Sequence, residues 1–166
     1  MFTLEYRRKH HTAFTLIELI VVLLVMSICM AATIPLLNNR ATEVITTAKA
    51  LAYDLQHAKN VAVMSHASVW ATFDTELNEY SLTDANSSPI THPMTKKDYT
   101  VAIPDATGVT MTVNLGSDDE VHFNPLGEPD ATGTVAFGHS SLEFLMTIRV
   151  SAETGRITVS RVNIEQ

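Results

Sequence analysis

Hydrophobic residues are concentrated in one long run near the N-terminus. From Phe14 to Ile34 there are 21 residues, and Glu18 is the only one that ionises. At about 1.5 Å per residue, a helix of this length spans the roughly 30 Å apolar core of a bilayer. The pattern predicts a membrane-spanning helix over residues 14–34 with one carboxylate near its start.

Beyond this run the apolar pattern narrows to a stripe that predicts an amphipathic helix over residues 35–66. Small or apolar residues recur at alternating spacings of four and three, at Leu37, Ala41, Val44, Ala48, Leu51, Leu55, Ala58 and Ala62. This 3.5-residue period is typical of a helix that packs one narrow face. Four alanines make a weak coiled-coil seam, so we expect the stripe to pack under a globular head.

The two predicted helices have almost no helix breakers between them. Glycine is absent from residues 14–66, so one helix could continue for about 80 Å. The only proline in this range is Pro35. Proline removes one backbone hydrogen bond, so we expect a kink at Pro35, where the chain leaves the membrane.

After Ser65 the hydrophobic period changes from helical to two, which is the period of half-buried strands. The predicted strands cover residues 69–73, 80–82, 109–115, 120–123, 133–137, 142–150 and 156–162. Residues 84–98 are rich in Asn, Ser and Pro and are predicted to form a surface loop. Residues 152–155 are predicted to form a hairpin turn in which Gly155 has a positive φ angle. A helix followed by an antiparallel sheet or sandwich gives an α+β fold, with a β-rich head at residues 67–166.

Charge is distributed unevenly on the two sides of the apolar run. Arg7, Arg8 and Lys9 precede it, whereas Glu5 is the only acidic residue on that side. This asymmetry predicts a cytoplasmic N-terminus and a translocated C-terminal part. Residues 1–13 contain three of the 11 basic and one of the 18 acidic residues, so the remainder has a net charge of −9. Such a charge disfavours nucleic acid as a general partner.

The start of the apolar run also carries a recognisable motif. The sequence AFTLIEL at residues 13–19 resembles the cleavage and methylation site of type IV prepilins and type II secretion pseudopilins. The resemblance implies that residues 1–13 are a leader, that a prepilin peptidase cuts between Ala13 and Phe14, and that Phe14 is then N-methylated. The family usually has glycine in place of Ala13, and the small alanine predicts slower processing rather than none.

Glu18 is the strongest candidate functional residue. A charged carboxylate at a bilayer centre costs about 2.5–3.5 kcal/mol on insertion scales, so a partner is expected. Cleavage before Phe14 would create an α-amino group that is normally protonated near neutral pH. The family resemblance implies that Glu18 pairs with this group on a neighbouring subunit, which would make both charges tolerable in lipid. The alternative is that Glu18 lies close enough to the cytoplasmic interface to be hydrated, with no partner.

A second resemblance extends through the head. The helical segment at 51–69, FNPLG at 123–127, GTV at 133–135 and TGRI at 154–157 are similar in order to the GspH/FimT family of minor pseudopilins and minor pilins. One departure is Lys59, where the family commonly has arginine. The resemblance implies a pilin-like fold and a non-enzymatic subunit anchored in the bacterial inner membrane. Its head would be periplasmic, and its partners would be the prepilin peptidase and other pseudopilin or pilin subunits.

Three functions remain open from the sequence. The leading one is a minor pseudopilin of a type II secretion system, assembled into a periplasmic pseudopilus. The second is a FimT-like minor type IV pilin that acts in pilus assembly or DNA uptake. The third is an exported soluble domain or enzyme, because residues 30–32 (Met-Ala-Ala) could loosely serve as an ordinary signal-peptide cleavage site.

The head offers little sign of catalytic or metal chemistry. Five histidines follow the apolar run, at His57, His66, His92, His122 and His139. None is spaced from another histidine or from Cys29 as a metal ligand would be, so neither a metal nor a cofactor is expected. His139 precedes two serines, but without a Gly-x-Ser-x-Gly turn this segment is predicted to be a surface loop. The sequence therefore predicts a protein that is not an enzyme.

Three arginines near the C-terminus are the candidate contacts for DNA. Arg149, Arg156 and Arg161 lie in or beside the last predicted hairpin and could bind phosphate groups. Arg156 and Arg161 are five residues apart, however, so a regular strand would direct them to opposite faces. Together with the net charge of −9, this spacing disfavours DNA binding.

Overall fold

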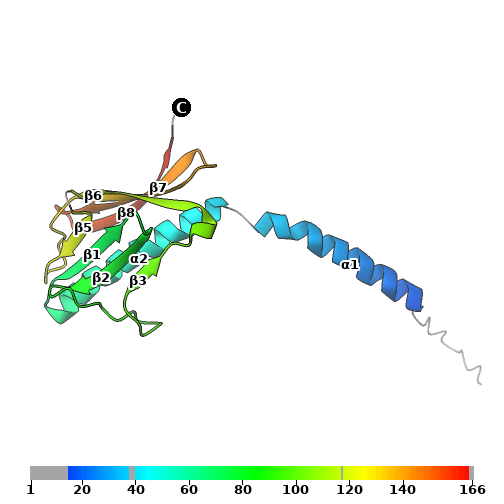
Figure 1. Cartoon of the computed structure of the whole chain (residues 1–166), viewed down its shortest axis with the longest axis horizontal. Helices are drawn as coiled ribbons and strands as arrows, with labels where there is room; N and C mark the ends of the chain where they lie inside the picture. The colour runs from blue at the N-terminus through cyan, green and yellow to red at the C-terminus, as the bar shows by residue number, and fades with distance from the viewer. Residues whose placement is uncertain (1–14, 38–39, 117, 165–166) are drawn as a thin grey trace, which may run out of the picture. The chain divides into compact units, whose positions relative to one another are not determined.

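A computed structural model of the chain describes residues 15–37, 40–116 and 118–164, with side chains of residues 31–37 left undescribed. It contains two compact units, residues 1–39 and 40–166, which we treat separately. Helix α1 covers Leu16–Leu37 in the first unit, and helix α2 covers Arg40–Ser65 in the second (Figure 1). Residues 38 and 39 lie outside the described residues, so continuity of the helix there stays a prediction. Helix α1 runs past Pro35 to Leu37, and the kink at Pro35 also stays a prediction.

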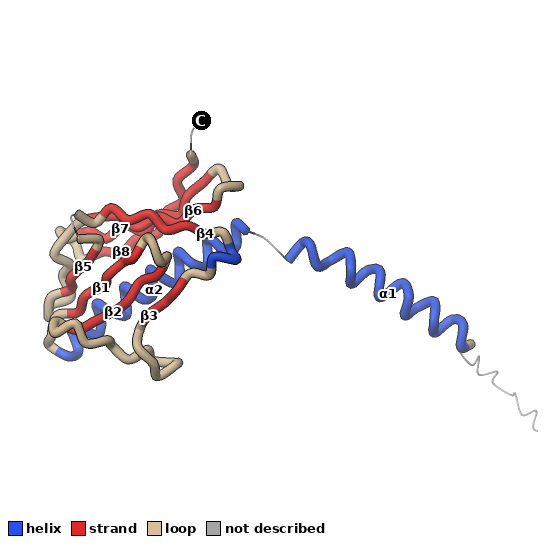
Figure 2. Tube along the Cα trace, in the orientation of Figure 1, coloured by secondary structure: helices blue, strands red, loops and turns tan. Residues whose placement is uncertain are grey.

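Helix α2 packs on the head through the stripe that the sequence predicts. Seven of the eight predicted positions lie in α2, and six of these are fully buried, namely Val44, Ala48, Leu51, Leu55, Ala58 and Ala62. Three of these six residues are alanines, which let the helix approach the strands closely. The helix contacts strands of both sheets of the head, and Figure 2 shows those strands beside it.

The head contains two four-stranded antiparallel sheets. The first has the order β3-β2-β1-β5, with β1 at Val69–Asp74, β2 at Glu79–Asp84, β3 at Thr100–Ala102 and β5 at Glu120–Phe123. The second has the order β4-β6-β7-β8, with β4 at Val109–Asn114, β6 at Gly133–His139, β7 at Phe144–Ser151 and β8 at Arg156–Asn163. The predicted α+β class, a helix packed on antiparallel sheets, is therefore confirmed.

The hydrophobic core lies where α2 meets the inner faces of both sheets. Alternate strand residues are buried, as the period of two predicts. The first sheet contributes Val69, Ala71, Phe73, Tyr80, Leu82, Val121 and Phe123. The second contributes Val109, Met111, Val135, Phe137, Phe144, Met146, Ile148 and Val150. The alternation confirms the predicted strands of the head.

Three details differ from the predicted strands or refine them. Strand β3 was not predicted; it pairs only with β2 and is three residues long. Strand β7 begins two residues after its predicted start, because Leu142 still belongs to a turn in which its N–H donates to the carbonyl of His139. The turn before β8 is as predicted, and Gly155 has a φ angle of +60°.

Candidate assembly site

The first turn of α1 is organised by Thr15. The backbone N–H of Glu18 lies 3.1 Å from the carbonyl oxygen of Thr15 and 3.3 Å from its hydroxyl oxygen. The Thr15 hydroxyl therefore caps the helix by accepting the Glu18 N–H, which it shares with the Thr15 carbonyl oxygen. Threonine followed three residues later by glutamate is the sequence signature of such a cap. That signal could have identified Thr15, which the sequence analysis did not single out.

The side chain of Glu18 is exposed and has no polar partner in the described part of the chain. Every residue from Thr15 to Met30 is exposed, although most are apolar. Leu16 is 76% exposed, and even Val22, the least exposed of the large apolar residues on this helix, is 45% exposed. Helix α1 thus presents apolar side chains all round and a single carboxylate at its start, and no described residue of its own unit covers them.

The predicted processing site cannot be located in the structure. Ala13 and Phe14 lie outside the described residues, as do the side chains of residues 31–34 at the other end of the predicted span. Among the residues that are described, no helix is both long and apolar enough to cross a membrane.

The three candidate DNA-binding arginines do not share one face. Arg149 lies opposite Thr158, which places it on the outer face of the second sheet together with Arg156. Arg161 lies opposite the buried Met146, on the inner face. Its guanidinium carbon is 4.0 Å from the centre of the Phe144 ring, in a cation–π contact. Arg156 and Arg161 thus lie on opposite faces, as their spacing predicts.

Comparison with known proteins supplies two findings. Residues 8–34 match the family described as the prokaryotic N-terminal methylation motif. The structure is also similar to that of the minor pseudopilin EpsH from the Type 2 Secretion System of Vibrio cholerae, with a TM-score of 0.57 and 12% identity, covering 75% of this chain and 99% of that one. The chain thus carries an N-terminal methylation motif and has a pilin-like fold.

A second solved structure has the same fold. It is the type IV minor pilin FimU of Pseudomonas aeruginosa, with a TM-score of 0.54 and 20% identity, covering 72% of this chain and 90% of that one. No curated protein sequence gives a match. The two solved relatives come from a secretion system and from a pilus, so fold alone does not separate these roles.

A polar cluster that the sequence did not reveal joins α2 to other parts of the head. The carboxylate of Asp54, on α2, accepts hydrogen bonds from the hydroxyls of Tyr80 at 2.6 Å and Tyr99 at 2.9 Å. Both tyrosines are only 2% exposed. Burial first, and then the hydrogen bond and negative charge of Asp54, raise the pKa of each phenol well above its usual value. Asp54 thus fixes the helix to β2 and to the segment before β3.

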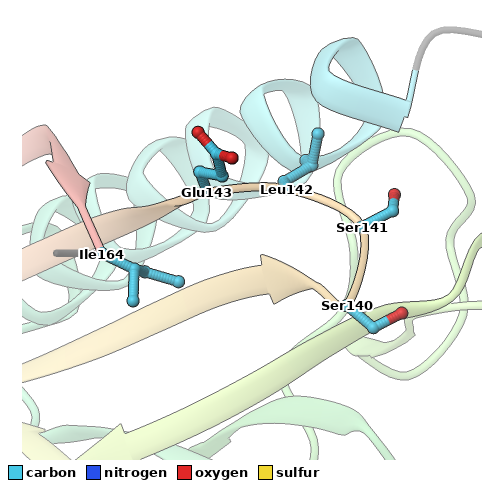
Figure 3. Close-up of a pocket in the computed structure, with 5 residues that line it drawn as sticks. All are labelled: Ser140, Ser141, Leu142, Glu143 and Ile164. Atoms are coloured by element: carbon cyan, nitrogen blue, oxygen red, sulfur yellow. The ribbon is translucent and has the colours of Figure 1, made fainter. Parts of the chain in front are cut away.

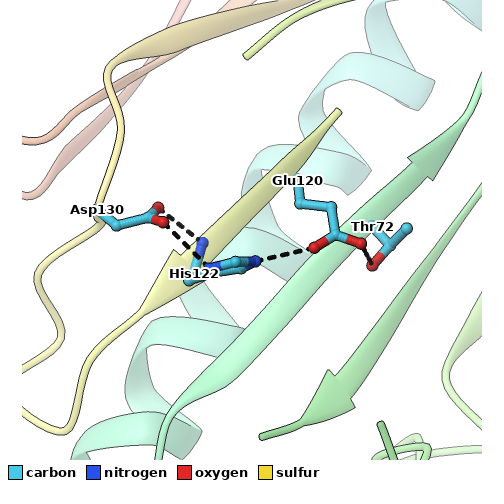
Figure 4. Close-up of polar contacts among 4 residues, drawn as sticks. All are labelled: Thr72, Glu120, His122 and Asp130. Atoms are coloured by element: carbon cyan, nitrogen blue, oxygen red, sulfur yellow. Dashed lines mark hydrogen bonds and ion pairs between the residues drawn. The ribbon is translucent and has the colours of Figure 1, made fainter. Parts of the chain in front are cut away.

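A second polar cluster lies on the outer face of the first sheet (Figure 4). The His122 ring lies between two carboxylates, with Nε2 at 2.9 Å from Glu120 and Nδ1 at 3.1 Å from Asp130. Glu120 also accepts a hydrogen bond from Thr72 at 3.0 Å, and Trp70 stacks on the His122 ring. No group of three such side chains in the described residues is arranged to hold a metal ion. The cluster joins β1, β5 and the segment after β5.

The turn that follows His139 lines a cavity of about 330 Å³ (Figure 3). The Nδ1 atom of His139 lies 2.8 Å from the Ser141 hydroxyl and accepts the Ser141 backbone N–H at 3.0 Å. Ser140 and Ser141 are exposed, and Glu143 and Ile164 line the same cavity. The bonds of His139 thus hold the β6–β7 turn, in agreement with the predicted surface loop.

Proposed function

We propose that this protein is a minor subunit of a type IV pilin-like filament, and specifically a minor pseudopilin of a type II secretion system. The observation that carries the proposal is the methylation-motif match at residues 8–34 in a chain whose head has a pilin-like fold. The role is one of assembly rather than catalysis. Residues 1–13 would be removed, residues 14–34 would anchor the chain in the inner membrane, and the head would be periplasmic.

Assembly depends, in this proposal, on Glu18 and the new N-terminus. The exposed carboxylate has no partner among the described residues of its own chain, and it follows Phe14 by four residues. An isolated charge in lipid is costly, whereas a charge paired with the Phe14 amine of an adjacent subunit is tolerable. Cleavage at Ala13 would therefore make the subunit competent to join a filament, and the charge pair would fix its register.

The mature N-terminus tests this proposal directly. Mass spectrometry of the protein isolated from membranes of its native host should give a chain that begins with N-methylated Phe14. Replacing Ala13 with glycine should speed cleavage, since the leader then ends in the residue that the family usually has. A mature chain that begins near residue 33, or one that retains residues 1–13 while functioning normally, would refute the proposal.

The role of Glu18 has a separate test. Glu18→Gln should leave membrane insertion intact, because it removes a charge from the apolar segment. It should reduce filament incorporation about tenfold or more, because the neighbouring amine then lacks its counter-ion. Glu76→Gln is the matched control, since Glu76 is an exposed carboxylate of the head. Normal incorporation of Glu18→Gln in a cross-linking assay would show that Glu18 acts without a partner.

A minor type IV pilin is the second candidate, supported by the likeness to FimU. The two roles predict different losses when the gene is deleted. A pseudopilin deletion should retain secreted enzymes in the periplasm, whereas a minor pilin deletion should abolish surface pili. Measuring both in one strain, with complementation by the intact gene, decides between them.

A further inference from the structure

Three of the four sheet edges in the head are short or covered by other parts of the chain. At the β4 edge, the Asn78 side chain donates to the carbonyl of Val109 at 2.9 Å and accepts the N–H of Met111 at 3.2 Å. At the β5 edge, the Asp130 backbone N–H donates to the carbonyl of His122, and the Asp130 carboxylate accepts the His122 N–H, both at 3.0 Å. The β3 edge is only three residues long. Such coverage is how proteins keep edges from pairing with other chains.

The fourth edge, β8, is eight residues long, and its hydrogen-bonding direction can be derived. Ile164, which follows the strand, donates its N–H to the carbonyl of Glu143 at 2.8 Å. In an antiparallel pair, residues that bond their partner alternate with residues whose N–H and C=O point away. The even-numbered residues of β8 therefore bond β7. Ile157, Val159, Arg161 and Asn163 direct their backbone groups to the free edge.

This free edge is uncovered within the described residues. No hydrogen bond from the described part of the chain reaches the outward backbone groups of these four residues. Apolar side chains beside the edge are also accessible, with Val159 37%, Val162 47% and Ile164 48% exposed. A long edge with free backbone groups and exposed apolar side chains has the properties of a site for strand addition.

The charge around the β8 edge indicates which strand fits it. Residues 144–164 contain Arg149, Arg156 and Arg161 but only one acidic residue, Glu153, which gives a net charge of +2. Residues 40–143 contain five basic and 14 acidic residues, which gives −9. The hairpin of β7 and β8 thus carries a net positive charge in a head that is otherwise acidic, and Glu143 directly precedes it. Arg149 and Arg156 lie on the outer face and Arg161 on the inner face, so acidic residues on either face of an added strand would be attracted.

We infer that the free edge of β8 binds an extended, acidic segment of another protein as an added strand. A second copy of this chain fits less well. Pairing two β8 edges would bring two basic hairpins together, and the β3, β4 and β5 edges are short or covered. This inference does not depend on processing at Ala13, because it rests on the head alone.

The test uses the full chain, isotopically labelled in detergent micelles, and amide hydrogen exchange measured by NMR. The probe is a synthetic peptide in which glutamate alternates with valine, and the control is the same peptide with lysine in place of glutamate. In the free chain, the amides of residues 158, 160 and 162 should exchange slowly and those of 157, 159, 161 and 163 rapidly. The glutamate peptide should slow the second set, and the lysine peptide should bind about tenfold more weakly or not at all.

Two sets of variants separate backbone pairing from charge attraction. Val159→Pro removes an outward N–H without breaking a bond to β7, so it should abolish protection by the peptide; Val159→Thr, which keeps the N–H, should not. Arg156→Glu combined with Arg161→Glu should weaken peptide binding about tenfold, whereas the same reversal at Lys96 and Lys97 should have little effect.

Four outcomes would overturn the inference. They are no protection by the glutamate peptide, equal protection by the lysine peptide, protection of the same amides that rises with protein concentration alone, and binding of duplex DNA with the same amides protected. The third would assign the edge to a second copy of the chain, and the fourth to nucleic acid. Because cleavage at Ala13 plays no part here, these outcomes leave the proposed function intact.

Discussion

Helices α1 and α2 are similar in length, with 22 and 26 residues, but they differ in how much of their apolar surface is buried. In α2 the apolar residues form one narrow stripe, and six of them are fully buried against the head. In α1 apolar residues occupy every face, and all residues from Leu16 to Met30 are exposed. The width of the apolar surface thus distinguishes a helix whose apolar face is buried by its own chain from one whose apolar faces require lipid or another protein to cover them.

The carboxylates of the two helices differ in the same way, in whether the described part of the chain supplies hydrogen-bond donors to them. Asp54 of α2 accepts hydrogen bonds from two buried tyrosines of the same chain. Glu18 of α1 has no such bond in the described residues. A carboxylate with internal donors stabilises the head, whereas a carboxylate without them is available to a partner. Substitutions in α2 should therefore affect head stability, and substitutions in α1 should affect assembly only.

The largest effect is expected at the centre of the α2 stripe. Leu51 is completely buried, so Leu51→Ala should lower the free energy of unfolding of the head by about 2–5 kcal/mol through lost burial and the cavity left behind. Urea denaturation followed by near-ultraviolet circular dichroism measures this change. Tyr53→Ala is the control, since Tyr53 is on the same helix but 81% exposed. Equal losses for both variants would show that the stripe does not hold α2 to the head.

The next largest effect is expected at the hydrogen bonds that join Asp54 of α2 to Tyr80 and Tyr99. Asp54→Ala would leave the buried hydroxyls of Tyr80 and Tyr99 without their shared acceptor. We expect a loss of about 2–3 kcal/mol in the free energy of unfolding, and a smaller loss for Asp54→Asn, whose amide oxygen still accepts a hydrogen bond. The same denaturation assay applies. A loss below that of Tyr53→Ala would contradict the assigned role of Asp54.

The same two tyrosines predict that the head loses stability in alkali. Folding raises the pKa of both phenols, so their contribution is complete below about pH 10, the ordinary tyrosine value, and is lost as pH rises towards the raised values. Above pH 10 only the unfolded state ionises, which costs about 1.4 kcal/mol per pH unit for each tyrosine. Tyr80→Phe should reduce this slope by about half in denaturation series between pH 9 and roughly pH 11. An unchanged slope would contradict the assignment.

The sequence predicts features that repeat along it and misses those that depend on distant residues. The stripe of α2 and the alternating strands are read from periods of 3.5 and two, and the buried residues agree. Strand β3 is too short to show a period, and it is held by pairing with β2. The contacts of Asp54 join residues 26 and 45 positions away, and no local spacing reveals them.

The features of the candidate site can likewise be separated into local ones, which the sequence predicts, and ones that depend on distant residues. The motif at residues 13–19 is local, and the family match at residues 8–34 contains it. The cap formed by Thr15 is also local, through its spacing to Glu18. By contrast, the open edge at β8 follows from which edges the rest of the chain covers, such as the contact of Asn78 with β4. Sequence therefore identifies the motif by which the subunit would be processed, but not the surfaces through which its head would contact others.

The smallest effect on the head is expected from α1, and it completes the comparison. Leu23 lies in the middle of the described part of α1 and is 55% exposed. Leu23→Ala should therefore change the free energy of unfolding of the head by no more than about 0.5 kcal/mol, in contrast to the same substitution at Leu51. Denaturation of both variants in the same detergent measures the difference. A loss comparable to that of Leu51→Ala would mean that α1 is held by the head of its own chain, and the division between the two helices would fail.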